Sequence, residues 1–178
     1  DLADRLGQFL AQTAPKRAEK LQIRYSGRIV EQDMTAVSRA FLTGFLRHIH
    51  GHEVNSVNAP AFAKNLGLEI LETRESGAGE FTDLMEVTVY GEDPFNSLEN
   101  REVRPFSKSL DSEKEQLLQG KLDANANRYS VGATFYGSKP RIITVNNRFI
   151  EGLPAGVILL IENKDCPGIV GHLGSLFG

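Results

Sequence analysis

Glycines recur at every third position near the end of the sequence, where Gly168, Gly171 and Gly174 follow an apolar run at 157–161. A glycine-rich turn between a strand and a helix can bind phosphate, because the free N–H groups of the helix N-terminus point at the anion. The spacing differs from the Gly-x-Gly-x-x-Gly of dinucleotide-binding turns, and no acidic residue follows that could bind a ribose. Close packing of the helix explains the glycines better, so we expect no nucleotide site here.

Three histidines occupy alternate positions, His48, His50 and His52. On a strand they would share one face and could bind a metal ion. The surrounding pattern predicts a helix end instead, where alternate residues do not converge and histidine interacts favourably with the helix dipole. We therefore expect no metal site. Cys166 has no nearby basic pair and no second thiol, which favours a small turn residue over a redox switch.

The composition indicates a globular cytoplasmic protein. The 178 residues include 20 Lys and Arg and 23 Asp and Glu, and 40% are hydrophobic, which is enough for a packed core. The absence of a basic block argues against nucleic-acid partners, and no run approaches the roughly 20 apolar residues that cross a membrane. One cysteine cannot form an internal disulfide.

The opening helix, without Met or an obvious cap before it, suggests a piece that once followed another domain.

Apolar spacing predicts an α+β fold, a mixed or antiparallel sheet of about five strands with helices on one face. Segment 91–127 loses this periodicity and is expected to be an insertion with at most one short helix at 112–122. The continuous apolar run 157–161 predicts a buried strand that begins a new unit. Helices are expected at 1–14, 35–49, from Pro60 to Gly67, and from 169 onward; strands are expected at 21–25, 68–74 paired with 84–90 as a hairpin, and 129–135 paired with 143–149 as a second hairpin.

Several segments together resemble the regulatory half of D-3-phosphoglycerate dehydrogenases: 6–12, 25–27, 54–60 (Val-Asn-Ser-Val-Asn-Ala-Pro), 132–137 (Gly-Ala-Thr-Phe-Tyr-Gly) and, most specifically, 163–178. The resemblance implies that residues 1–153 form the intervening, allosteric substrate-binding domain, and that residues 154–178 provide the first strand and helix of an ACT domain with a ferredoxin-like fold. It also implies a parent enzyme that oxidises 3-phosphoglycerate with NAD in L-serine biosynthesis. The catalytic and NAD-binding residues would then lie upstream, so this piece has no catalytic residue or cofactor of its own.

The same resemblance implies a binding site for the feedback inhibitor L-serine where two ACT domains meet, and therefore a homo-oligomer. Its polar positions match Asn163 and Asp165, and its backbone donors match Gly168 and Ile169. A helix N-terminus offers unpaired N–H groups to a carboxylate, and Asp165 could bind the ammonium group. The alternative is that Asp165 only caps the helix, and the two roles are compatible.

A second site of this family binds a phosphate-like anion on the intervening domain. Arg141 matches one of its basic positions, while the other basic position falls on Leu153 and its tyrosine on Asn163. A guanidinium can give a phosphate two parallel hydrogen bonds. Lys139 and Arg148 are nearby cations that could substitute, although basic residues on a hairpin are often only solvated.

Two further functions stay open beside the dehydrogenase. The same module could belong to an iron–sulfur L-serine dehydratase, or it could be a free-standing amino-acid-binding or assembly module. Residues 6–12 favour the dehydrogenase. In each case the expected task is to convert binding of serine or an anion into a new arrangement of subunits, which requires a ligand that prefers one arrangement.

Overall fold

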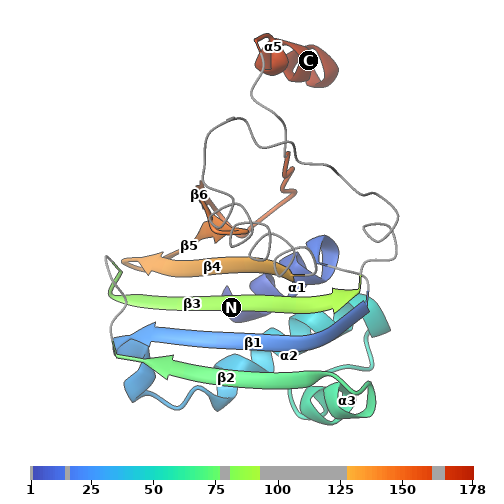
Figure 1. The fold of residues 1–178 in the computed structure, drawn as a ribbon, viewed down its shortest axis with the longest axis vertical. Coiled ribbons are helices and arrows are strands. Elements are labelled where there is room, and N and C mark those ends of the chain that lie inside the picture. Colours follow the sequence, from blue (N-terminus) through green and yellow to red (C-terminus); the bar gives the residue numbers. More distant parts are fainter. Residues whose placement is uncertain (1, 15–16, 77–80, 93–127, 162–166) are drawn as a thin grey trace, which may run out of the picture.

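The computed structural model describes residues 2–14, 17–76, 81–92, 128–161 and 167–178. Its strands form one mixed sheet in the order β2-β1-β3-β4-β5-β6, and α1, α2 and α3 cover one face of that sheet (Figure 1). The predicted α+β class is confirmed, with a sixth strand added. Apart from Gly91 and Glu92, which end β3, the predicted insertion 91–127 and its short helix at 112–122 lie outside the described residues.

All four predicted helices form, with boundaries that differ by a few residues. Within the part of the chain that the structure describes, no helix is long and apolar enough to cross a membrane. The helices are α1 (Leu2–Thr13), α2 (Thr35–His50), α3 (Ala59–Asn65) and α5 (Ile169–Phe177), with a 3-10 turn η1 (Arg28–Glu31); the strands are β1 (Arg17–Gly27), β2 (Glu69–Glu75), β3 (Asp83–Glu92), β4 (Arg128–Tyr136), β5 (Lys139–Val145) and β6 (Arg148–Gly152).

The core lies between the sheet and the helix layer. Alternate residues of a strand point to opposite faces, so each central strand has one apolar side and one polar side. The apolar side of the sheet packs against the inner faces of α1 and α2, whereas the polar side carries residues such as Gln22, Arg24 and Glu86. Fully buried core side chains include Leu6, Leu10, Leu21, Ile23, Tyr25, Phe41, Phe45, Val87 and Val89.

Two glycines bring the backbones of α1 and α2 into direct contact. A Cβ atom at Gly44 would lie 2.8 Å from the carbonyl carbon of Asp4 and closer still to its oxygen. A Cβ atom at Gly7 would lie 2.6 Å from the backbone nitrogen of Phe45 and would overlap the carbonyl oxygen of Phe41. Neither helix could approach so closely with any larger residue at these positions. The crossing therefore fixes α1 on α2 through main-chain contact.

The predicted hairpin between 68–74 and 84–90 is wrong, because β1 lies between those two strands. β2 pairs with β1 in parallel at the edge of the sheet, and β3 pairs with the other side of β1 in antiparallel. A parallel pair needs a crossover connection, and α2 and α3 supply it between β1 and β2. The buried side chains of β1 require a central strand, while β2 is mostly exposed, as an edge strand is.

The predicted strand 143–149 is also wrong, since it contains a turn. β5 ends at Val145 and β6 begins at Arg148, with Asn146 and Asn147 between them at φ angles of 47° and 61°. Positive φ at both central residues is the signature of a type I′ hairpin turn, which asparagine adopts more readily than most residues. The preceding turn, at Gly137 and Ser138, joins β4 to β5 as predicted.

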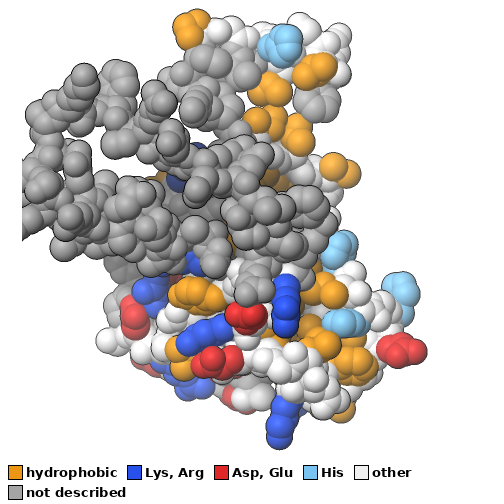
Figure 2. All heavy atoms as spheres, turned by 45° about the vertical axis from the view of Figure 1, so that its right-hand side comes forward, with side chains coloured by type: hydrophobic (Ala, Val, Ile, Leu, Met, Phe, Trp, Pro, Cys, Tyr) orange, Lys and Arg blue, Asp and Glu red, His pale blue; other side chains and the backbone are white. Residues whose placement is uncertain are grey.

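The predicted buried strand at 157–161 does not form. Its side chains are 42% to 102% exposed, and no described strand pairs with it. A strand needs a neighbour for its N–H and C=O groups, so the apolar pattern alone is insufficient. Figure 2 shows hydrophobic side chains on the surface toward α5, at the top of the view. The described residues also leave open space at Gly171 and Gly174, so they show no close packing there.

Candidate functional site

The start of α5 is the described part of the predicted serine site. Gly168 is its N-cap residue, with a left-handed backbone (φ 90°, ψ −7°) that glycine adopts without strain. The Gly168 carbonyl accepts the first helical hydrogen bond from the His172 N–H at 2.9 Å. Gly168 has no side chain with which to cap the helix, and the structure shows no capping hydrogen bond from this residue to the N–H groups of the first turn, which have no partner within the helix itself. Asn163 and Asp165 lie outside the described residues.

The predicted anion-binding cations lie at two different ends of the β5–β6 hairpin. Arg141 and Lys139 are two residues apart near the turn that opens β5, so they share a face. Arg148 pairs with Val145 at the opposite end of β5. The structure therefore brings Arg141 and Lys139 together and separates Arg148 from them.

Arg141 is already engaged by the protein. Its Nε lies 3.5 Å from Glu151 Oε1 on β6, and its Nη1 donates to the Pro140 carbonyl at 3.2 Å. Its side chain is only 19% exposed. An anion at this hairpin would compete with Glu151 for the guanidinium. Leu153, at the family's other basic position, is exposed and contributes no charge.

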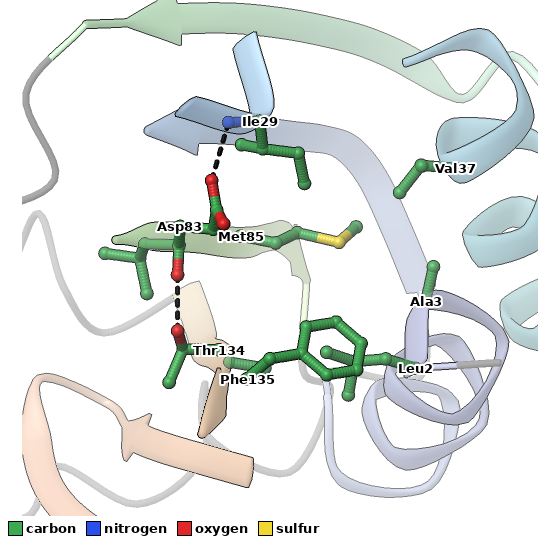
Figure 3. Close-up of a pocket in the computed structure, with 10 residues that line it drawn as sticks. Leu2, Ala3, Ile29, Val37, Asp83, Met85, Thr134 and Phe135 are labelled. Carbon is green, nitrogen blue, oxygen red and sulfur yellow. Dashed lines mark hydrogen bonds between the residues drawn. The ribbon is translucent and has the colours of Figure 1, made fainter. Parts of the chain in front are cut away.

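An apolar pocket of about 220 Å³ lies beside the N-terminus of α1 (Figure 3). Two hydrogen bonds occupy the polar groups on its wall. Asp83 Oδ1 accepts from the Ile29 N–H at 2.6 Å, and the Thr134 hydroxyl donates to the Asp83 carbonyl. What remains is apolar surface that suits a hydrocarbon group rather than acid–base chemistry. The apolar lining comes from five separate elements, which is why no local sequence pattern reveals it: Leu2, Ala3, Ile29, Val37, Leu84, Met85, Ala133 and Phe135.

The same helix holds the segment that leads toward α5. Arg5 Nη1 donates to the carbonyl of Pro154 at 3.0 Å, and Pro154 is buried. Beyond this contact, residues 155–158, Leu160 and one side of α1 border a groove of about 830 Å³. α1 thus contacts the apolar pocket, α2 and this linker. No sequence pattern singles out Arg5, because an arginine on a helix surface is ordinary.

The alternate histidines, Cys166 and a buried tyrosine are the other side chains whose types could support chemistry. No group of three or more His, Cys, Asp or Glu within the described ranges could hold a metal ion. His48 and His50 lie in the last turn of α2, as the helix-end interpretation predicts, and Cys166 lies outside the described residues. Burial raises the pKa of Tyr25 to about 12, and its hydroxyl lies 2.8 Å from Ser38 Oγ. Tyr25 is a core residue and lines none of the cavities above.

Comparison with known proteins identifies the family of this chain. A family model described as the D-3-phosphoglycerate dehydrogenase intervening domain matches residues 1–101. Relatives named D-3-phosphoglycerate dehydrogenase include those of Methanocaldococcus jannaschii (24% identical over 97% of this chain and 26% of that protein), Bacillus subtilis (23%, 99% and 28%) and Synechocystis (26%, 99% and 26%). The chain spans about a quarter of the length of these curated relatives.

Proposed function

Since this chain belongs to the D-3-phosphoglycerate dehydrogenase intervening-domain family, we propose that it serves as the regulatory part of an NAD-dependent D-3-phosphoglycerate dehydrogenase. The whole protein would oxidise 3-phosphoglycerate in the cytoplasm, in the first step of L-serine biosynthesis. Catalytic residues and the NAD site belong to the rest of that protein. The observation that carries this proposal is the coverage: the matches reach across nearly all of this chain, yet only about a quarter of each relative.

Residues 154–178 would begin an ACT domain, with the rest of that domain and a second subunit completing it. The exposed apolar side chains of the linker and α5 support this assignment. Val157 and Leu159 of the linker, and Val170 and Leu176 of α5, are all more than half exposed. Apolar surface of this extent is typical of a segment that packs against something else. A homo-oligomer joined through this end would bury it.

Serine would act at the start of α5 and reach the intervening domain through the linker. Its carboxylate would take the N–H groups at Gly168 and Ile169, while Asn163 and Asp165 would bind the ammonium and hydroxyl groups. The hydrogen bond from Arg5 to Pro154 supports a path from the linker to α1. At the hairpin, a phosphate-like anion would bind Arg141 and Lys139 by displacing Glu151. Arg148 begins β6 at the other end of the hairpin and would not share the same ion.

The test uses the full-length protein that contains this chain. It should form NADH from D-3-phosphoglycerate and NAD, and L-serine should inhibit it. Asp165→Ala removes a charge-assisted hydrogen bond, which is typically equivalent to about 1.5–3 kcal/mol, so at least tenfold more serine should be needed for half-inhibition. Glu53→Ala, which removes an exposed carboxylate elsewhere, is the matched control and should leave the serine response unchanged.

Three results would contradict the proposal in different ways. A full-length protein that forms no NADH with this substrate would remove the enzyme class. An active enzyme that serine does not inhibit would remove the effector. An enzyme whose serine response is the same in Asp165→Ala and in the unaltered protein would remove the predicted site while leaving the enzyme and its effector in place.

A further inference from the structure

A small polar hollow of about 160 Å³ lies on the face of the sheet opposite to α1, α2 and α3. Every residue that lines it is polar or charged, in contrast to the apolar pocket beside α1. The lining side chains come from β1, β3, β4 and the turn before β6: Gln22, Arg24, Glu86, Thr88, Tyr90, Arg128, Ser130 and Asn147. A second hollow of similar size adjoins it and shares Arg128, Ser130 and Asn147.

Of the two arginines that line the hollow, only Arg24 forms an ion pair with a described carboxylate. Arg24 lies 2.5 Å from Glu86 and 3.8 Å from Glu75. Within the described residues the Arg128 side chain forms no hydrogen bond or ion pair, although the residue is only partly exposed. The lining contains two guanidinium groups and one carboxylate, and Glu75 lies outside the lining beside Arg24. The charge of Arg128 is therefore the one that no described carboxylate offsets.

The groups around Arg128 are held in place. Tyr90 pairs with Arg128 and Thr88 pairs with Ser130 across the β3–β4 ladder. The turn before β6 is attached to β4 by two hydrogen bonds, from the Asn146 N–H to the Ser130 carbonyl at 2.8 Å and from the Ser130 N–H to Asn146 Oδ1 at 2.9 Å. Tyr90 is fixed by its hydrogen bond to Gln22 Oε1 at 3.0 Å. Preorganised donors bind a ligand with little loss of conformational freedom.

We propose that this hollow binds a compact oxyanion, a carboxylate or phosphate group, with Arg128 as its charged ligand. A guanidinium can donate two parallel hydrogen bonds to either group, and the hydroxyls of Ser130 and Thr88 and the side-chain amide of Asn147 are further donors beside it. The volume suits a small ion rather than a drug-sized molecule. None of these residues takes part in the serine site or in the Arg141 site, so the inference does not depend on the proposed function.

Inorganic phosphate and acetate, titrated separately into the 178-residue chain at constant ionic strength, test the proposal. We expect saturable shifts of the Ser130 and Asn147 amide resonances with at least one of the two anions. Phosphate alone would identify a phosphate group as the ligand, and acetate alone a carboxylate. Arg128→Gln should weaken the binding at least tenfold, and Arg128→Lys, which keeps the charge but not the paired donors, should weaken it less.

Lys64→Gln is the matched control, because Lys64 is an exposed cation of α3 that lines neither hollow and belongs to neither the serine site nor the Arg141 site. It should change the affinity less than twofold. No saturable shift with either anion would overturn the proposal. Equal weakening by Lys64→Gln and Arg128→Gln would also overturn it, because the anion would then respond to general surface charge. Unchanged affinity in both Arg128 variants would overturn it as well.

Discussion

Replacing Gly44 by alanine tests whether the α1–α2 crossing depends on contact between main chains. The added Cβ would lie 2.8 Å from the carbonyl carbon of Asp4 and 3.1 Å from its Cα, and it would overlap the oxygen. These atoms are backbone, so the whole of α1 must shift. Overpacking typically costs about 1–3 kcal/mol, and a rigid obstacle places this case near the upper value. Alanine regains about 1 kcal/mol of helix propensity, which leaves a net loss of about 2 kcal/mol.

Equilibrium unfolding in urea and thermal unfolding, both followed by circular dichroism, measure this loss. For a chain of this size a loss of about 2 kcal/mol should lower Tm by about 4–8 °C. Gly174→Ala in α5 is the matched control, since nothing in the described residues lies within 4 Å of a Cβ there, and it should cost nothing. Gly7→Ala combined with Gly44→Ala should cost less than the sum, because one shift of α1 relieves both contacts. A Gly44→Ala chain as stable as the unaltered one would refute the reasoning.

Two further predictions concern a buried hydroxyl and a turn. Burial raises the pKa of Tyr25 to about 12, whereas an unfolded tyrosine titrates near 10. The contribution of Tyr25 to the free energy of unfolding should therefore be complete below about pH 10 and should fall by about 3 kcal/mol as the pH rises to about 12. Urea unfolding measured across this pH range should show the fall. The Tyr25→Phe protein, which has no hydroxyl to ionise, should not show it. Asn147→Gly should raise the stability by about 0.5–1 kcal/mol, because glycine adopts the positive φ of this turn more easily; a lower unfolding midpoint would contradict the turn assignment.

The local elements could be predicted from the sequence because their signals lie within a few residues. The 3.6-residue spacing of Leu6, Leu10, Phe41 and Phe45 reports which side of each helix is buried, and the structure buries those side chains. The Asn146–Asn147 pair was a readable turn signal as well, although the alternation of apolar residues on both sides concealed it. An apolar alternation continues through a two-residue turn, so periodicity alone cannot separate one strand from two.

Strand partners could not be predicted in the same way, because they depend on residues far apart in the chain. Nothing local in 68–74 shows that this segment lies parallel to β1 rather than beside β3. The helices between β1 and β2 were the available indication, since a crossover that contains helices favours a parallel pair. The contact of Arg141 with Glu151 depends likewise on the register of β5 and β6. A sequence motif can indicate which residues could bind a ligand. Only the fold shows that a carboxylate of the protein already occupies one of them.

The position of α1 explains how the intervening domain could respond to its linker, as the proposed regulation requires. Arg5 binds Pro154 on one side of the helix, while Gly7 meets α2 through main-chain atoms on another. A contact between backbones has no flexible side chain that could absorb a displacement, and a packed interior deforms little. A pull on Pro154 that moved α1 would therefore move α2 with it or break the crossing. Leu2 and Ala3, at the start of the same helix, line the apolar pocket, so the pocket would change shape in the same motion.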